Sequence, residues 1–321
     1  MSSIKRPRKG SLQFWPRKRA SKFLPRVNWS SITSSKKGLK GFICYKAGMV
    51  SAYVKDDTPN SMTKGKHIIV SATVLECPPM KILSVRFYKN GIVKTEIFAE
   101  NPEKELIGKI KIPKKKISGI SEIEKIKDYD DIRIICYSQV KKAGLKKTPD
   151  ISEIGLSGTA EEKLSFVKEN LGKEIKISDI FEKKHLVDIH GLTKGRGFSG
   201  PVKRFGITLK QHKSEKGRRR PGSLGPWHPA RVTFRVPMAG QLGMFTRIVY
   251  NSTIIDLGST HGKEKIEGKL KNMENYGNVQ TDHLIVAGSV QGSPKRQLVV
   301  TFPLRETKKQ AKKIYDLIEL R

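Results

Sequence analysis

Cysteine is scarce in this 321-residue sequence, which has three, at Cys44, Cys77 and Cys136. Each stands alone in an apolar stretch and no two have the spacing of zinc ligands, so we expect buried free thiols in a reducing compartment. No apolar run reaches the roughly eighteen residues that a membrane helix needs. The basic N-terminus lacks the hydrophobic stretch and cleavage site of a secretory signal. We therefore expect no membrane partner and no secretion.

The common signatures of enzymes are also missing. There is no H-E-x-x-H, no Cys/His cluster and no G-x-S-x-G. Gly195, Gly197 and Gly200 complete a G-x-G-x-x-G after the strand-like HLVDI, but dinucleotide binding requires a helix at the third glycine. The residues after Pro201 lack the apolar spacing of a packed helix. We therefore expect no enzyme, cofactor, metal or small-molecule substrate, and expect these glycines to bring the backbone close to phosphates.

Acidic residues are absent where basic residues are most frequent. The net charge is +34, no acid precedes Asp56, and Glu215 is the single acid in 190–235. By contrast, residues 96–182 hold seventeen basic and seventeen acidic side chains. Like charges in a glycine-rich and proline-rich segment repel one another, so the segment has no core of its own and needs a dense anionic partner. The two basic regions therefore indicate binding to a nucleic-acid backbone.

The candidate contacts are basic and aromatic side chains of these two regions. The basic residues expected to meet phosphates are Lys5, Arg6, Arg8, Lys9, Arg17, Lys18, Arg19, Lys22, Arg26, Lys194, Arg196, Lys203, Arg204, Lys213, Arg218, Arg219, Arg220 and Arg231. Aromatic rings among them could stack on unpaired bases, worth about 1–3 kcal/mol per base, or anchor the segments to the protein's own core. For Trp29 and Phe205 both interpretations stay open. Trp227, between Gly-Pro and His-Pro, is favoured as a functional loop tip.

Short runs rich in Val, Ile, Phe and Tyr predict antiparallel strands in a barrel or sandwich. They are residues 42–54, 67–77, 82–88, 92–99, 132–140, 185–189, 245–251, 253–258, 283–290 and 297–304. Two helices are expected, one over 159–172 with a Thr-x-x-Glu capping box and a terminal glycine, and one over 307–320. The first lies in the charge-balanced stretch. The pattern therefore predicts a mainly β fold with an α+β insertion.

Five long motifs follow one another along the chain. They are GFICYKAGMVSAY (41–53), ATVLECPPMKILSVRFY (72–88), HGLTKGRGFSGPVKRFG (190–206), RRRPGSLGPWHPARVTFRVPMAGQLGMFTRIVYN (218–251) and VAGSVQGSPKRQLVVTF (286–302). Together they resemble the universal large-subunit ribosomal protein L3 family in its archaeal and eukaryotic form. The C-terminus at Arg321 is more similar to archaeal members. Val50 departs from the family's usual threonine, and the insertion is only loosely similar.

The resemblance implies a six-stranded Greek-key translation-protein β-barrel with a long basic N-terminal tail and an internal loop extension. The implied parts are a basic rRNA-binding N-terminal extension (1–40), a β-barrel core (41–95 and 180–305), an inserted α+β lobe (96–179), a basic finger loop (191–238) and a C-terminal helix (306–321). Trp227 and His228 resemble the finger tip that reaches toward the peptidyl transferase centre.

The partners that the resemblance implies are large-subunit rRNA and neighbouring ribosomal proteins, in the cytoplasmic ribosome, with no homo-oligomer. The expected function is structural: supporting subunit assembly and shaping the surroundings of the peptidyl transferase centre. The alternative from another class is a free-standing RNA chaperone or RNA-modifying enzyme with a barrel core. An enzyme would show a cofactor site and turnover on isolated RNA, whereas an assembly protein would co-sediment with large subunits.

Overall fold

The computed structural model describes residues 15–34, 36–100, 102–111, 123, 126, 128–213, 216–259 and 268–321. The chain forms two compact units. Unit 1 comprises Met1–Lys22 and Leu192–Thr246, and unit 2 comprises Phe23–Gly191 and Arg247–Arg321. Most of the expected basic tail and finger therefore belongs to unit 1. No helix in the described ranges is long and apolar enough to cross a bilayer.

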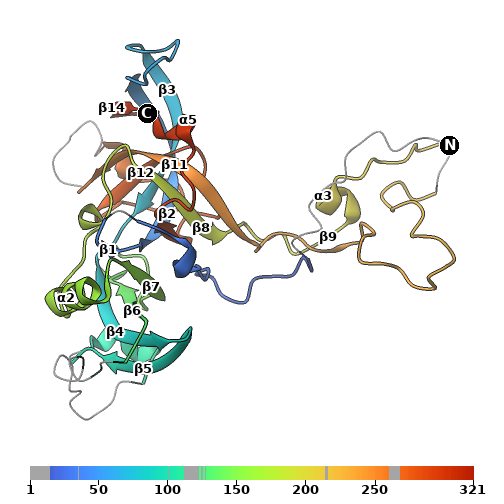
Figure 1. Cartoon of the computed structure of the whole chain (residues 1–321). Coiled ribbons are helices and arrows are strands. Elements are labelled where there is room, and N and C mark those ends of the chain that lie inside the picture. Colours follow the sequence, from blue (N-terminus) through green and yellow to red (C-terminus); the bar gives the residue numbers. More distant parts are fainter. Residues whose placement is uncertain are drawn as a thin grey trace. The chain divides into compact units, whose positions relative to one another are not determined.

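Unit 2 is mainly β and its larger sheet has seven strands (Figure 1). In sheet order they are β13 (Gln297–Thr301), β8 (Leu186–Leu192), β11 (Thr246–Gly258), β12 (His283–Ala287), β3 (His67–Glu76), β2 (Gly41–Asp56) and β14 (Tyr315–Leu320). The long β2 pairs with β13 through its first residues, where Tyr45 faces Gln297, and with β14 through its last, where Asp56 faces Tyr315. β13 also pairs with β8, so pairing runs from β2 through five further strands and returns to β2.

A second, five-stranded antiparallel sheet lies in the same unit. Its order is β1 (Gly38–Leu39), β7 (Ile151–Ser157), β6 (Asp131–Ser138), β4 (Met80–Lys89) and β5 (Ile92–Phe98). Helix α2 (Ala160–Asn170) follows β7 and begins with the expected capping box, in which Glu162 N donates to Thr159 Oγ1 at 3.4 Å and Thr159 N to Glu162 Oε2 at 3.0 Å. Gly172 has a φ of +80°, the left-handed conformation expected of a terminal glycine.

The main core joins the two sheets. Tyr45 on β2 is buried, and its hydroxyl donates to Asp150 Oδ2 at 2.6 Å and lies 2.7 Å from Ser138 Oγ. Trp29, in the 3₁₀ helix η1 (Trp29–Ser31), is 3% exposed in this core. A Cβ added to Gly155 would lie 2.7 Å from the Cβ of Trp29, so the absence of a side chain at Gly155 makes room for the tryptophan. Trp29 is therefore a core anchor, and its base-stacking interpretation is wrong.

The expected strands overlap observed strands, with two runs merged. Residues 245–251 and 253–258 form the single strand β11, and among strands longer than two residues the sequence missed β7 and β14. β4 pairs with β6 on one side and with β5 on the other, so residues 80–95 belong to the same sheet as the expected insertion and do not pair with β3. The three cysteines are buried and free, as predicted.

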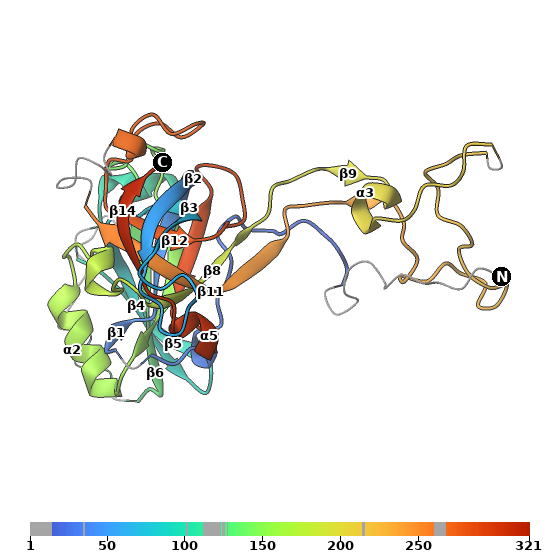
Figure 2. The same ribbon diagram turned by 90° about the horizontal axis from the view of Figure 1, so that it is seen from above.

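The prediction of a helix over 307–320 is wrong. Only α5 (Lys308–Ala311) is helical, and Tyr315–Leu320 form β14, which pairs with the last residues of β2 and lies beside it in both views (Figures 1 and 2). There Leu320 is buried in an apolar cluster that is separate from the main core and includes Val54, Val74 and Ile285. Strand pairing and this burial outweigh the helical preference of the lysines.

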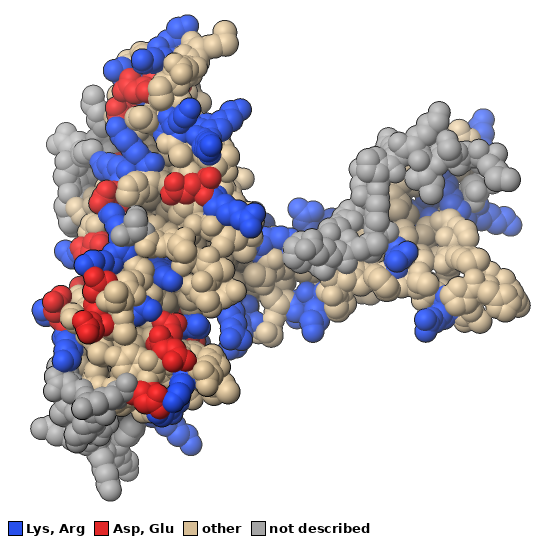
Figure 3. Space-filling model, viewed as in Figure 1, with Lys and Arg blue, Asp and Glu red and all other residues tan. Residues whose placement is uncertain are grey.

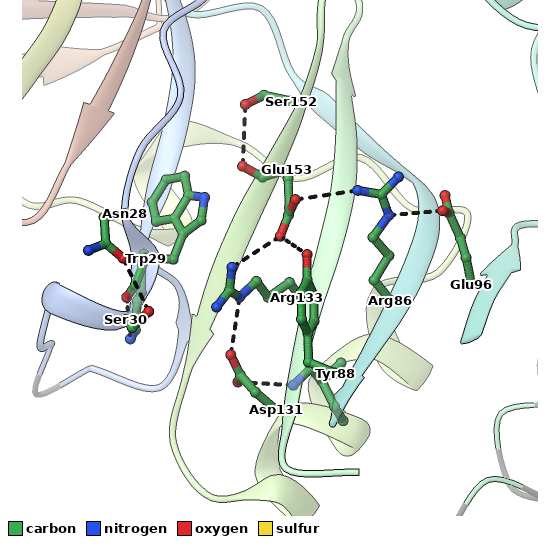
Figure 4. Close-up of polar contacts among 12 residues, drawn as sticks. Asn28, Trp29, Ser30, Arg86, Tyr88, Glu96, Asp131, Arg133, Ser152 and Glu153 are labelled. Carbon is green, nitrogen blue, oxygen red and sulfur yellow. Dashed lines mark hydrogen bonds and ion pairs between the residues drawn. The ribbon is translucent and has the colours of Figure 1, made fainter. Parts of the chain in front are cut away.

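Charged side chains on the five-stranded sheet neutralise one another (Figure 4). Arg86 donates to Glu96 at 2.9 Å and lies 3.4 Å from Glu153. Arg133 lies 3.3 Å from the same Glu153 and 3.1 Å from Asp131. Since each guanidinium has carboxylate partners within the sheet, this network serves the fold and presents little unbalanced charge.

Candidate nucleic-acid interface

Unit 1 carries basic side chains without any acid among its described residues, 15–22, 192–213 and 216–246 (Figure 3). Its regular structure is brief: β9 (Phe198–Ser199) pairs with β10 (Gly240–Gln241), and α3 spans Pro201–Phe205. The two sides of the finger are joined at its base, where Thr193 N donates to Phe245 O at 3.0 Å. The remainder is turns and irregular chain held by few internal bonds.

The three glycines of the G-x-G-x-x-G have different surroundings. A Cβ on Gly195 would lie 2.9 Å from Met244 Cγ, so this glycine permits a close internal contact. Gly197 has a φ of +60°, and added Cβ atoms on Gly197 or Gly200 would meet nothing within 4 Å. A helix does follow Gly200, contrary to the sequence argument, but α3 has only five residues. Such a turn lacks the packed helix that a dinucleotide fold requires.

A small aromatic cluster holds unit 1 together. The ring of Trp15 lies 6.1 Å from that of Phe205 and 5.9 Å from that of Phe234. The guanidinium of Arg17 lies over Phe205, 4.2 Å from the ring centre, and Phe205 is buried. The expectation that this segment has no core of its own is therefore wrong in part. Phe205 is a packing anchor, and residues 15–17 of the tail belong to the same cluster.

Arg204 is a structural clamp within unit 1. Its Nε donates to Gln241 O at 3.0 Å, its Nη1 to Met238 O at 3.0 Å and its Nη2 to Arg17 O at 3.3 Å. A Cβ on Gly240 would lie 2.9 Å from the guanidinium, so glycine is needed for this approach. Each of the three guanidinium nitrogens of Arg204 thus donates a hydrogen bond to a main-chain carbonyl, which uses three of its five N–H donors.

Most other predicted contact residues in the described ranges are exposed. They are Lys18, Arg19, Lys22, Lys194, Arg196, Lys203, Lys213, Arg218, Arg219, Arg220 and Arg231 in unit 1, and Arg26 in unit 2. Arg17 is half-buried, and Lys5, Arg6, Arg8 and Lys9 lie outside the described residues. Arg218 Nε donates to Lys210 O at 3.2 Å, and Lys210 N donates back to Arg218 O at 3.2 Å. This pair ties the two sides of the loop between them.

Trp227 projects from unit 1 with 87% of its surface exposed. It follows Gly225 and Pro226, and Gly225 has a φ of +144°, a backbone conformation that favours glycine. Arg231 N donates to Pro229 O at 2.7 Å and shapes the turn beyond the tryptophan. Phe198 is similarly exposed, at 82%. Large exposed aromatic side chains beside cations are the arrangement needed to stack on bases or to enter a partner's surface.

A mostly exposed basic unit whose described residues include no acid, attached to a mainly β unit, defines a nucleic-acid-binding class of protein. The family model for ribosomal protein L3 matches residues 1–320. The large ribosomal subunit protein uL3 of Methanocaldococcus jannaschii is 38% identical over 315 residues, covering 94% of this chain and 92% of its own length. The uL3 proteins of Archaeoglobus fulgidus and Pyrobaculum calidifontis are each 37% identical, covering 94% and 95% of this chain and 93% and 94% of their own lengths. The chain belongs to the ribosomal protein L3 family.

Proposed function

We propose that this chain is a structural protein of the large ribosomal subunit that binds large-subunit rRNA through unit 1. The observation that carries the proposal is the set of exposed cations in unit 1, which have no acid among the unit's described residues, together with the family membership. Its partners are large-subunit rRNA and neighbouring ribosomal proteins in the cytoplasmic ribosome. Its work is to support assembly of the subunit and to shape the surroundings of the peptidyl transferase centre.

Within unit 1, two kinds of basic residue act differently. The exposed residues, such as Lys203 and Arg219, neutralise rRNA phosphates, which supplies most of the affinity. Arg17 and Arg204 hold the tail against the finger and so fix where those charges lie. Gly197 and Gly200 leave open space beside the backbone, which supports a close approach of phosphates there.

Trp227 and His228 form the finger tip near the peptidyl transferase centre in this proposal. The exposure of Trp227 supports it, because a ring used as an internal anchor would be buried. A rigid aromatic side chain contributes position more than affinity, since a few kcal/mol of stacking is small beside many phosphate contacts. The tip therefore acts by keeping neighbouring nucleotides in one arrangement.

The finer architecture we propose is the six-stranded Greek-key barrel of translation proteins, built from β2, β3, β12, β11, β8 and β13. Pairing of β13 with both β8 and β2 supports this closure. The boundaries expected from the sequence, with an extension over 1–40, a lobe over 96–179 and a finger over 191–238, are proposed with it. Within these boundaries the lobe contributes β6 and β7 to the five-stranded sheet, and β1, β4 and most of β5 come from residues before it.

Co-sedimentation with large subunits through a high-salt wash tests the function. A structural protein stays with the subunit and shows no turnover on isolated RNA. The family assignment gives no support to the alternative of a free-standing RNA chaperone or RNA-modifying enzyme. Release of the protein from large subunits at moderate salt, with activity on free RNA, would contradict the proposal.

A further inference from the structure

A second group of unbalanced cations lies in unit 2, around α5. We name it the C-terminal basic patch, consisting of Arg305, Lys308, Lys309, Lys312 and Lys313. The first four are exposed and Lys313 is half-buried; Glu306 is the one acid in this short stretch. Basic side chains gather over α5 in the space-filling view (Figure 3). The sequence alone predicts a helix over this stretch and indicates no binding role for it.

Cations elsewhere in unit 2 are commonly paired with carboxylates. Lys81 lies 2.6 Å from Glu103, and Lys142 lies 2.7 Å from Glu174. Within the described ranges, no carboxylate lies within 4.0 Å of any charged group of the patch, although Lys184 close by pairs with Asp316. Concentrated like charges destabilise the free protein by self-repulsion. The patch is therefore electrostatically unbalanced and suited to an anionic partner.

The backbone that carries the patch is fixed at both ends. Asp188 on β8 is 2% exposed, and its carboxylate accepts hydrogen bonds from Leu304 N and Asn251 N, each at 2.8 Å. At the other end Ile314 N donates to Thr58 Oγ1 at 3.1 Å, and β14 pairs with β2 directly afterwards. A partner that binds here need order only side chains, which lowers the entropic cost of binding.

We propose that the C-terminal basic patch is a further RNA-binding surface that contacts phosphate groups of large-subunit rRNA. The inference rests on the proposed function and adds a contact region in unit 2, apart from the tail and finger. Four of the five side chains are lysines, which act as point charges on phosphates and are depleted from protein–protein interfaces. No aromatic residue occurs in 305–313, so the patch has charge without the anchor typical of a protein interface.

The first test compares two variants of equal charge. Lys308, Lys309, Lys312 and Lys313 are changed together to Gln in one, and Lys104, Lys109, Lys147 and Lys173 in the other. The control lysines are exposed and have no ion pair in the described chain. The probe is protein-free rRNA from archaeal large subunits, and the readout is the slope of log K against log salt. Circular dichroism and the urea midpoint check that both variants fold.

For the patch variant we expect the slope to become shallower by about 3, because each phosphate contact contributes roughly 0.7–0.9. The control variant keeps the wild-type slope. Equal slopes for both variants would overturn the inference, and so would a patch variant that keeps the wild-type slope but enters subunits poorly, which would indicate an acidic protein partner. A shallow slope for the wild type would instead mean that the proposed function fails.

A tethered probe gives the location. All three native cysteines are buried, so an iron chelate attached to Lys309→Cys reports from that position alone. Hydroxyl radicals generated there in reconstituted large subunits should cleave rRNA at discrete nucleotides, as should a probe on Lys203→Cys in unit 1. Cleavage from Lys203→Cys without cleavage from Lys309→Cys would overturn the patch and leave the proposed function standing. Absence of cleavage from both would overturn both.

Discussion

Arg17 and Arg204 are joined by two reciprocal hydrogen bonds, in which each guanidinium donates to the main-chain carbonyl of the other residue. Arg17 Nη1 lies 3.2 Å from Arg204 O, and Arg204 Nη2 lies 3.3 Å from Arg17 O. The two residues are 187 positions apart in sequence. The bonds therefore link the N-terminal tail to the finger inside unit 1, and two basic residues predicted to meet phosphates also determine the shape of the unit.

Arg204→Ala should loosen unit 1. Loss of the side chain leaves the carbonyls of Arg17, Met238 and Gln241 without this donor, and each exposed or half-buried hydrogen bond contributes about 0.5–1.5 kcal/mol. Amide hydrogen exchange in α3 and residues 238–246 should become faster. The matched control is Lys203→Ala, which removes an exposed neighbouring cation. Equal exchange rates in the two variants would show that the clamp contributes nothing to local stability.

Glu76→Gln should destabilise unit 2. The Glu76 carboxylate is fully buried and accepts hydrogen bonds from the Tyr276 hydroxyl, from Gln280 N at 2.7 Å and from Thr281 N at 2.9 Å. A glutamine amide places a donor among these donors and removes the charge, at a cost of roughly 1.5–3 kcal/mol. Urea unfolding measures the loss, with the exposed Glu169→Gln as control. An unchanged urea midpoint for Glu76→Gln would contradict the prediction.

His190 should make unit 2 less stable in mild acid. Burial lowers the pKa of its imidazole to about 4, whereas an unfolded histidine titrates near 6.5. Between these values the unfolded chain binds a proton that the folded chain excludes, so stability is lost as pH falls from about 6.5 to about 4. The loss attributable to His190 approaches roughly 3 kcal/mol at the lower end.

His190→Gln should flatten this part of the stability profile, since glutamine does not titrate and can still reach Thr301, whose hydroxyl lies 3.2 Å from His190 Nε2. The measurement is the free energy of unfolding at several pH values between 4 and 7. His212→Gln, which changes an exposed histidine of unit 1, serves as control. If the wild type and His190→Gln have parallel profiles, His190 is not the titrating group.

Trp227→Ala should leave the yield of large subunits near normal. Its stacking contributes a few kcal/mol at most, whereas many phosphate contacts dominate affinity. The chemical reactivity of rRNA around the peptidyl transferase centre should change, and so should the affinity for peptidyl transferase inhibitors. The triple change of Arg218, Arg219 and Arg220 to Ala should do the reverse and impair assembly first. Unaltered reactivity and inhibitor affinity in Trp227→Ala subunits would rule out the finger-tip role.

The sequence predicts those parts of the fold whose causes are local. Helix α2 is predictable because Thr159 and Glu162 form a cap within one turn. Most strands are predictable because their apolar runs are bounded by turn residues. β14 was missed because its conformation depends on the available edge of β2, far away in sequence. The lysines before it suggest a helix, and only pairing with a distant strand decides against it.

The candidate site shows the same division. Charge and glycine content locate unit 1, but no local pattern distinguishes Arg204 from Arg219, because the carbonyls that Arg204 binds lie in distant segments. Trp29 and Trp227 are both tryptophans near cations in the sequence, yet one is 3% exposed and the other 87%. Trp29 packs against Gly41 and Gly155, and the spacing of these residues in the sequence does not predict that contact.

The salt dependence of binding to protein-free large-subunit rRNA tests the central claim most directly. If about eight of the basic residues in the tail and finger meet phosphates, log K should fall against log salt with a slope of roughly −6 to −7. Changing Arg218, Arg219 and Arg220 to Gln should make that slope shallower by about 2 to 3. A wild-type slope shallower than about −2 would contradict the claim that unit 1 binds rRNA through its unbalanced charge.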